Sequence, residues 1–198
     1  MNNIAALKKI AKSLKVSKIA NVVLNDERFA ICSGSSKPIH HHFGDGGLLK
    51  HTFEVVELCL NNNEYFKPLN KAVCDRKLFL AALFHDSGKM WDYTYSGHIP
   101  EQSVAGSSYH GKVEGWIATP HKRNVHHISR SGILWSQSAK DHGFKDQNDE
   151  VLHAILAHHG LRNWGSPVPP NSRLAWLLHL CDGISARMDD GERWDCVK

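Results

Sequence analysis

Apolar residues recur at intervals of three and four along several stretches of this 198-residue chain, a spacing typical of amphipathic helices. Two short helices are predicted near the start of the chain, and five longer ones follow. The sequence shows no series of alternating positions that would indicate a sheet, so the pattern predicts an all-α fold. The predicted helices cover residues 4–14, 16–24, 47–63, 76–86, 127–143, 149–160 and 172–190.

Residues at the expected helix ends refine this prediction. Asp75 is the expected N-cap of the helix at 76–86, and Gly160 is the expected C-cap of the helix at 149–160. The asparagines at 61–63 are expected to end the helix that starts at residue 47. The last helix carries one apolar stripe that should face the core: Leu174, Leu177, Leu178, Cys181, Ile184 and Met188.

Three stretches are predicted to be irregular. Residues 32–47 ("CSGSSKPIHHHFGDGG") and 163–171 ("NWGSPVPPN") are rich in residues that break helices. Residues 91–123 are polar and contain glycines, and a short hairpin is predicted around "YTYSGHI". The chain is therefore interpreted as one helical domain over residues 25–190, preceded by a helical extension over residues 1–24.

Composition and charge narrow the class of protein. Hydrophobic residues make up 41% and charged residues 22%, as in ordinary globular domains, and the net charge of +4 permits an anionic substrate without requiring nucleic acid. The start of the chain lacks the apolar core of a signal peptide, and no apolar run is long enough to span a membrane. The scattered cysteines form no Cys-x-x-Cys pair, which favours a reducing, cytoplasmic location: Cys32, Cys59, Cys74, Cys181 and Cys196.

Histidine is unusually frequent, with 15 residues, and several lie where a helix should face the core or end. The clearest case is "LFLAALFHDSGKMWDY", in which an apolar helix runs directly into a histidine and an acid. A buried imidazole or carboxylate is costly unless it is paired or bound to a metal. These groups suit divalent ions such as manganese, iron, zinc, cobalt or nickel. Two such ions, bridged by one carboxylate, would accommodate the whole set: His51, His85, Asp86, His127, His158, His159 and Asp182.

This ordered set resembles the signature of the HD-domain metal-dependent phosphohydrolases, His … His-Asp … Asp, with the lone histidine and His-His pair of the two-metal branch. The resemblance is closer still to the catalytic domain of YhaM-type 3′-5′ exoribonucleases and runs over residues 24–190. It is carried by "HHHFGDGGLLKHT", "LFHDSGK", "HHIS", "AHHG", "WGSPV" and "CDGISARM". Each motif alone would be weak evidence, but their order along the chain is specific.

The resemblance implies a role for each matched residue. One metal would be held by His51, His85, Asp86 and Asp182, and the other by Asp86, His127, His158 and His159. Asp86 would thus bridge the two ions. Lys89 would act as a fixed cation near the phosphate or the leaving oxygen. His41 and His42 would lie near the substrate phosphate, and the tandem glycines at 46–47 would allow a tight turn into the helix of His51.

The sequence departs from this pattern in three places. The YhaM-type enzymes carry an OB-like nucleic-acid-binding domain before the catalytic unit, whereas only the short stretch up to Leu24 is expected here. Residues 95–124 form a longer insertion, expected to cap the site. The usual Gly-His-Ile motif is replaced by His126-His127-Ile128, and a literal Gly97-His98-Ile99 occurs earlier. His127 is the preferred ligand because it opens a predicted helix; His126 and His98 are the alternatives.

Simpler interpretations stay open at several positions. His85 and Asp86 alone could form a charge pair at a helix C-terminus, and Lys89 could simply favour the helix dipole there. Consecutive His158 and His159 point about 100° apart on a helix, so one of them could orient a ligand instead of binding metal. Trp164 could stack on a nucleobase, although tryptophan is more often buried in a core.

The primary functional hypothesis is a metal-dependent phosphohydrolase in which a two-metal activated water cleaves nucleotide phosphoesters, with Asp86 and Lys89 as the catalytic residues. Its substrates would be nucleoside monophosphates or short oligonucleotides. One alternative is a 3′-5′ exonuclease on single-stranded RNA or DNA, for which five lysines near the start of the chain could supply a basic patch. The other alternative is a diiron oxygenase of the same fold. A non-catalytic nucleotide sensor should have lost ligands, and none is missing here.

Overall fold

The computed structural model describes residues 3–37, 40–96 and 115–188 of the chain. Within them the fold is a helical bundle organised around α5 (Asp75–Phe84). Every side chain of α5 from Leu78 to Phe84 is buried, as expected for a helix that is apolar all round and has neighbours on each side. The prediction of an all-α fold is confirmed.

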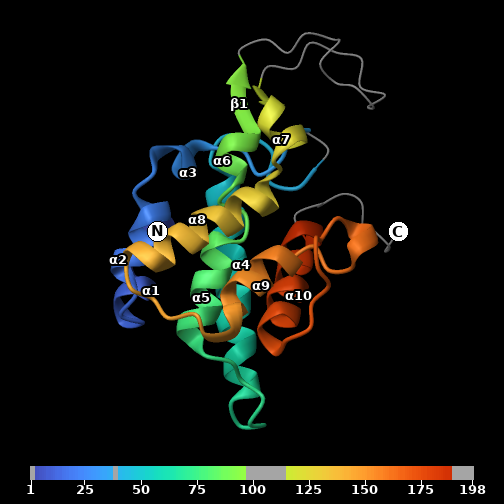
Figure 1. The fold of residues 1–198 in the computed structure, drawn as a ribbon. Coiled ribbons are helices and arrows are strands. Elements are labelled where there is room, and N and C mark those ends of the chain that lie inside the picture. Colours follow the sequence, from blue (N-terminus) through green and yellow to red (C-terminus); the bar gives the residue numbers. More distant parts are fainter. Residues whose placement is uncertain (1–2, 38–39, 97–114, 189–198) are drawn as a thin grey trace, which may run out of the picture.

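Helices α4 (Gly47–Phe66), α9 (Glu150–Ala157) and α10 (Arg173–Met188) pack around α5. Figure 1 shows α4 and α5 running side by side through the middle of the molecule, with α9 and α10 together on one side. Each of the three outer helices buries only one face, which is the amphipathic arrangement that their sequences predict. The ends of these helices therefore meet near the C-terminal end of α5.

The N-terminal helices α1 (Asn3–Ser13) and α2 (Ser17–Leu24) contribute Leu7, Ile19 and Val23 to the same hydrophobic core as α4 and α5. The short α3 (Glu27–Ile31) follows, and the carboxylate of its N-cap, Asp26, accepts a hydrogen bond from the backbone N–H of Arg28 (2.9 Å). The domain boundary expected at residue 24 stays a prediction.

The chain leaves α5 through a buried turn into α6 (Lys89–Asp92) and then β1 (Tyr93–Ser96), which projects from one end of the bundle (Figure 1). Strand β1 pairs antiparallel with β2 (Gly115–Ala118), and α7 (Pro120–Asn124) and α8 (His127–Asp141) follow. The predicted hairpin is thus present in part, with β2 as the partner strand. His98 and most of the expected cap lie outside the described residues. Two 3₁₀ turns complete the described elements, η2 (Gln147–Asp149) and η3 (Arg162–Trp164).

Three details of the sequence interpretation were wrong. Helix α4 continues through Asn63 because the buried amide of Asn63 faces the following loop and bonds to both backbone polar groups of Val73. Cys74, and not Asp75, is the N-cap of α5. The apolar stripe of α10 is buried only as far as Cys181, because Ile184 and Met188 are exposed. None of the helices in the described residues is long and apolar enough to cross a membrane.

The amide of Asn63 should be a measurable part of the stability of the fold. Its Nδ2 donates to the Val73 carbonyl (2.9 Å) and to Asp75 Oδ1 (2.6 Å), and its Oδ1 accepts from the Val73 N–H (2.9 Å). Asn63→Ala should lower the free energy of unfolding in urea by about 1–3 kcal/mol, because it removes hydrogen bonds from the partly buried Val73 and Asp75. Asn62→Ala is the matched control, since that side chain is exposed. Equal losses for the two variants would contradict this interpretation.

Candidate metal centre

The centre of the site is the buried turn that follows α5. Ser87 Oγ donates to the Phe84 carbonyl and Ser131 Oγ on α8 accepts from the Gly88 N–H, both at 2.8 Å, so the turn is fixed to two helices. Gly88 packs so closely against α8 that a Cβ there would lie 2.2 Å from the His127 carbonyl oxygen. Any other residue at position 88 would push the two segments apart. This close packing brings Asp86 and His127 together.

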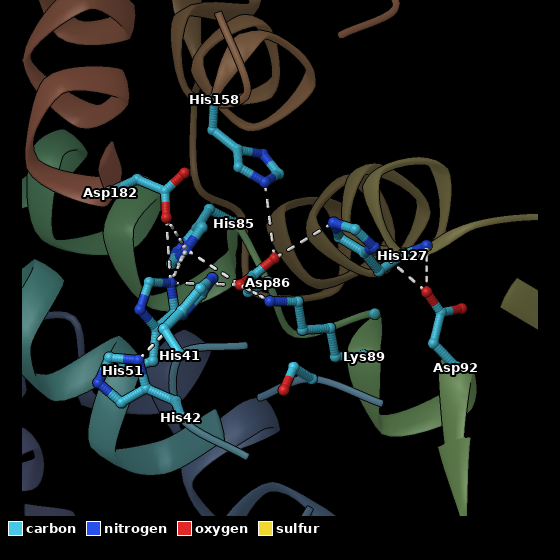
Figure 2. Close-up of polar contacts among 12 residues, drawn as sticks. His41, His42, His51, His85, Asp86, Lys89, Asp92, His127, His158 and Asp182 are labelled. Carbon is cyan, nitrogen blue, oxygen red and sulfur yellow. Dashed lines mark hydrogen bonds and ion pairs between the residues drawn. The ribbon is translucent and has the colours of Figure 1, made fainter. Parts of the chain in front are cut away.

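One oxygen of Asp86, Oδ2, faces the imidazoles of α4 and the α5 end (Figure 2). The Nε2 atoms of His51 and His85 lie 3.3 and 3.5 Å from it and 3.2 Å from each other. From α10, Asp182 Oδ1 lies 3.0 Å from His51 Nε2 and 3.7 Å from His85 Nε2. Four side chains from three distant segments of the chain therefore point at one small volume.

The other oxygen of Asp86, Oδ1, faces α8 and the end of α9. The Nε2 atoms of His127 and His158 lie 3.4 and 3.5 Å from it. All three of these atoms are buried and have no hydrogen-bond partner. A ring nitrogen of the neighbouring His159 also lies within 4.8 Å of its counterparts on His127 and His158. Buried polar atoms that converge without partners are what a cation site requires.

Hydrogen bonds on the far side of each ring define its tautomer. Nδ1–H of His85 donates to the Ala82 carbonyl, and Nδ1–H of His158 donates to the Ile155 carbonyl, both at 2.7 Å. Nδ1–H of His127 donates to the carboxylate of Asp92 (3.2 Å). In the neutral form of each ring, Nε2 therefore carries a lone pair that points toward Asp86, and this is the form in which histidine binds metals.

His51 follows the same rule through a longer chain of hydrogen bonds. Ser185 Oγ donates to Glu54 Oε2 (2.9 Å), so it can only accept at its contact with His51 Nδ1 (3.0 Å). Nδ1 of His51 is thus the protonated nitrogen, and Nε2 carries the lone pair. Lone pairs of His51 and His85 that face each other at 3.2 Å repel unless a positive charge lies between them.

The charges around the site show how strongly it favours a cation. Burial alone lowers the pKa of His85, but the carboxylates of Asp86 and Asp182 outweigh burial and raise that pKa to about 10. Burial alone would raise the pKa of both carboxyl groups, yet Lys89 beside Asp86 and His51 beside Asp182 hold them well below the usual range. In the metal-free protein a proton on His85 would supply the positive charge that a divalent ion supplies when bound.

On the α8 side His127 and His159 stay neutral. Burial lowers the pKa of His127 to about 4, despite the opposing effect of Asp92, and burial and His158 also lower the pKa of His159. His126, the alternative ligand, packs against the His127 ring but is less buried than His127 and has a left-handed backbone with φ of 68°. Its position is therefore consistent with the preference for His127.

Lys89 is buried, and its Nζ lies 2.6 Å from Asp86 Oδ2. Burial alone would lower the pKa of Lys89, but Asp86 outweighs burial and raises it above the ordinary lysine value. Lys89 is therefore a permanent cation beside the bridging carboxylate. This is where the sequence analysis expected a fixed positive charge.

The histidines of the 32–47 loop occupy two different positions. His41 lines the pocket beside the site, together with Asp86 and Lys89. His42 lies behind it, with a left-handed backbone, and its Nε2–H donates to Glu54 Oε2 (2.9 Å). Nδ1 of His42 then accepts from His41 (3.0 Å). Of the two, only His41 is in a position to touch a substrate.

An open pocket of about 740 Å³ leads from this site to the surface. Its inner end is formed by His41, Asp86, Lys89 and the histidines at the end of α9, and its outer wall by α10. Trp164, predicted to contact a base, lines the same pocket and is 59% exposed. The structure thus places every predicted site residue except His42 either in the lining of this pocket or in the cluster directly beneath it.

Sequence reasoning missed the residues that orient the ligands: Glu54, Asp92 and Ser185. Asp92 accepts from both the backbone N–H and the Nδ1–H of His127, as well as from His121 Nδ1. The spacing of these residues in the sequence could have identified them. Each lies three positions after a predicted site residue (His51, Lys89 or Asp182) and so shares its helix face.

Comparison with known proteins agrees with this geometry. The sequence matches the HD domain family over residues 48–187, which is more than half of the chain and contains every ligand in the proposed set. The chain belongs to the HD-domain family. The predicted helical fold and the predicted family are therefore confirmed.

Several curated relatives of this HD-domain protein are named 3′-5′ exoribonuclease YhaM. The relative from Shouchella clausii is 28% identical over 90% of this chain and 50% of its own length. The relative from Geobacillus sp. is 30% identical over 76% of this chain and 40% of its own, and that from Bacillus subtilis is 29% identical over 78% and 43%. The chain thus spans about half the length, or less, of the curated relatives it matches. No solved structure matches it significantly.

If the converging groups hold a metal, an ion should stabilise the HD-domain fold. Adding Mn²⁺ at 100 times its dissociation constant to EDTA-treated protein should contribute about 2.7 kcal/mol, or roughly 5–10 °C in the thermal midpoint. Asp86→Asn should remove most of this shift because Asp86 faces both groups of imidazoles. Asp141→Asn, which alters an exposed carboxylate on α8, should keep it. A full shift in Asp86→Asn would contradict the proposed ligand set.

Metal binding should also displace the proton of His85. Because the pKa of His85 is about 10 in the metal-free protein, the ring is protonated at pH 8 and must become neutral to bind a metal. Apparent metal affinity should therefore rise with pH until about pH 10, with about one proton released per protein at pH 8. Calorimetry in two buffers of different ionisation enthalpy measures this release. Identical heats in the two buffers would argue against it.

Proposed function

We propose that this HD-domain protein is a metal-dependent phosphohydrolase that cleaves phosphoester bonds of nucleotides or short oligonucleotides. One observation carries the proposal: the two oxygens of Asp86 each face a separate pair of imidazole nitrogens whose lone pairs point inward. A single buried carboxylate between two sets of neutral ligands fits a bridged pair of divalent cations. Asp182 adds a ligand on one side of Asp86, and His159 adds one on the other.

We propose that His51, His85, Asp86 and Asp182 hold one ion and Asp86, His127, His158 and His159 the other. Such ions neutralise the charge of a phosphate and lower the pKa of a bound water. The donor set of imidazole and carboxylate suits manganese, iron, zinc, cobalt or nickel alike. Asp92 and Ser185 would keep the rings of His127 and His51 in the tautomers that binding requires.

The side chains around the pocket provide the other functions that hydrolysis needs. The permanent positive charge of Lys89, on the floor of the pocket, would stabilise negative charge that develops on phosphoryl oxygens. Burial and Lys89 lower the pKa of His41 to about 3, so His41 is neutral and would act as a hydrogen-bond partner and not as a cation. Arg187 near the mouth of the pocket adds a second positive charge for an anionic substrate.

The shape and lining of the pocket favour a nucleotide over a bare phosphate. Its volume of about 740 Å³ accommodates a base and a sugar as well as the phosphate, and its outer wall is largely apolar. Trp164 presents an exposed ring there, suited to stacking on a base. The name of the relatives, 3′-5′ exoribonuclease, favours a second candidate function. This function is the removal of nucleotides from the 3′ end of a single strand.

A substrate screen tests the proposal. EDTA-treated protein reloaded with Mn²⁺ should be incubated with mononucleotides, cyclic nucleotides, nucleoside triphosphates and short single-stranded RNA and DNA. Metal-dependent release of phosphate or of a 5′-nucleotide is the expected result. If no substrate is hydrolysed with any of the metals named above, the proposal fails. Iron-dependent consumption of oxygen instead would favour the oxygenase alternative.

Lys89 offers a more specific test of the chemistry. Lys89→Met should lower kcat by about 10²–10³, the usual cost of removing one group that stabilises charge in the transition state. Bound metal, measured by elemental analysis, should be unchanged, because Lys89 contributes no ligand. Lys140→Met, at an exposed position on α8, is the control for the loss of a positive charge. Unchanged kcat in Lys89→Met would remove Lys89 from the proposed mechanism.

A further inference from the structure

Three aromatic rings follow one another along the outer side of α10, beside the metal centre. Trp164 from η3 lies against His179 with ring centroids 5.8 Å apart, and Trp176 also lies 5.8 Å from His179. Trp164 is 59% exposed and Trp176 45% exposed. We call these three residues the aromatic row. The proposed function assigns no task to His179 or Trp176.

Two rings of the aromatic row, those of His179 and Trp164, pack against the backbone at the end of α9. Nδ1–H of His179 donates to the backbone carbonyl of His158 (2.8 Å), which ties the middle ring to the segment of the proposed ligands. Gly160 lies beneath the rings with φ of 92°, and a Cβ there would lie 2.5 Å from His179 Cε1 and 2.9 Å from Trp164 Cε3. The absence of a side chain at Gly160 therefore lets both rings pack onto the backbone.

The row connects two hollows on the surface. Trp164 and His179 line the pocket of the metal centre, and Trp176 lines an adjoining groove of about 420 Å³ between α10 and the end of α4. Leu180, 55% exposed, lines both hollows. The groove also carries Lys71 and Arg173, and no acidic residue of the described chain lines it. Exposed rings with cations beside them suit a polyanion that carries flat bases.

We propose that the aromatic row and the groove beyond it bind the nucleotides of a single strand that neighbour the one held at the metal centre. This inference rests on the proposed function and extends it to a substrate class, single-stranded oligonucleotides of three or more nucleotides. Trp164 contacts the base nearest the metals, and Trp176 contacts a base further along. Lys71 and Arg173 lie near the phosphates that follow.

The dimensions of α10 match this arrangement. Asp182, at the metal centre, and Trp176 are six residues apart along the helix, or about 9 Å at a rise of 1.5 Å per residue. Stacked nucleotides advance by about 3.4 Å each, so roughly three of them span this length. A mononucleotide would leave Trp176 without a contact.

A second copy of the chain is the other occupant to consider for an exposed apolar surface. It would have to cover Trp164 and Leu180, which also line the metal-centre pocket, and would therefore obstruct the entrance. The cations Lys71 and Arg173 would in addition need acidic partners across such an interface. A nucleic-acid strand satisfies both constraints, because it enters the pocket itself and carries the complementary charge.

The test compares substrates of two lengths. Binding of fluorescent two- and six-nucleotide single strands to EDTA-treated protein is measured by anisotropy, and their hydrolysis is measured with Mn²⁺. Trp176→Ala should weaken binding of the six-nucleotide strand, and raise its KM, by about 5- to 150-fold, since stacking on one base is worth about 1–3 kcal/mol. The two-nucleotide strand should be affected less than about twofold. Trp176→Phe, which keeps a ring, should restore most of the loss.

Two further measurements complete the test. Lys71→Ala and Arg173→Ala should each reduce the slope of log affinity against log salt by about 0.7 for the longer strand. Tyr65→Ala, which removes an exposed ring on α4 that does not line the groove, is the control and should change neither length. The oligomeric state of each variant is measured by light scattering.

Equal effects of Trp176→Ala on both lengths, or no effect on either, would overturn the inference while leaving the proposed function intact. Loss of a dimer in Trp176→Ala, with unchanged binding of the longer strand, would assign the surface to a second copy and also overturn it. If wild-type protein hydrolyses nothing, the proposed function fails. The anisotropy of the two strands then decides separately whether the row binds nucleic acid.

Discussion

The structure depends on one buried carboxylate. Asp86 lies in a turn whose own residues, 85–88, are all buried, and its oxygens meet imidazoles from α4, α8 and the end of α9. A charge in this position is tolerated only if positive charge surrounds it, because burying an unpaired carboxylate costs several kcal/mol. Lys89 supplies one such charge. The inward lone pairs of the histidines leave room for more, and divalent ions are the simplest way to provide it.

The packing of the bundle follows from this requirement. Helix α5 is apolar on every side, so it can deliver Asp86 to the interior and let four other segments approach it. Gly88 allows α8 to come within contact distance of the turn, and Ser131 holds it there. Asp92 and Ser185 then fix the orientation of the rings. The rings of His85, His127 and His158 thus come from helix ends, whereas His51 and Asp182 lie within α4 and α10.

Much of this arrangement could be predicted from the sequence. The order of His51, His85, Asp86 and Asp182 is specific enough to indicate one site, because a histidine and an acid at the end of an apolar helix need a reason to be there. Helix periods also locate the seven predicted helices, apart from their last turns. The short helices α3, α6 and α7 were not predicted. Asn63 was misjudged because its preference for helix ends is outweighed by tertiary hydrogen bonds to Val73.

The remaining features depend on contacts that no local pattern reveals. Sequence spacing places Trp176 and His179 on one helix, but only the fold brings Trp164 against them. The separate positions of His41 and His42 likewise arise from the left-handed backbone at His42 and its bond to Glu54.

The measurement that tests the central claim most directly is anomalous diffraction from crystals grown with Mn²⁺. The account predicts two peaks, one beside each oxygen of Asp86. A map with no peak at Asp86, or with ions bound only elsewhere, would contradict it.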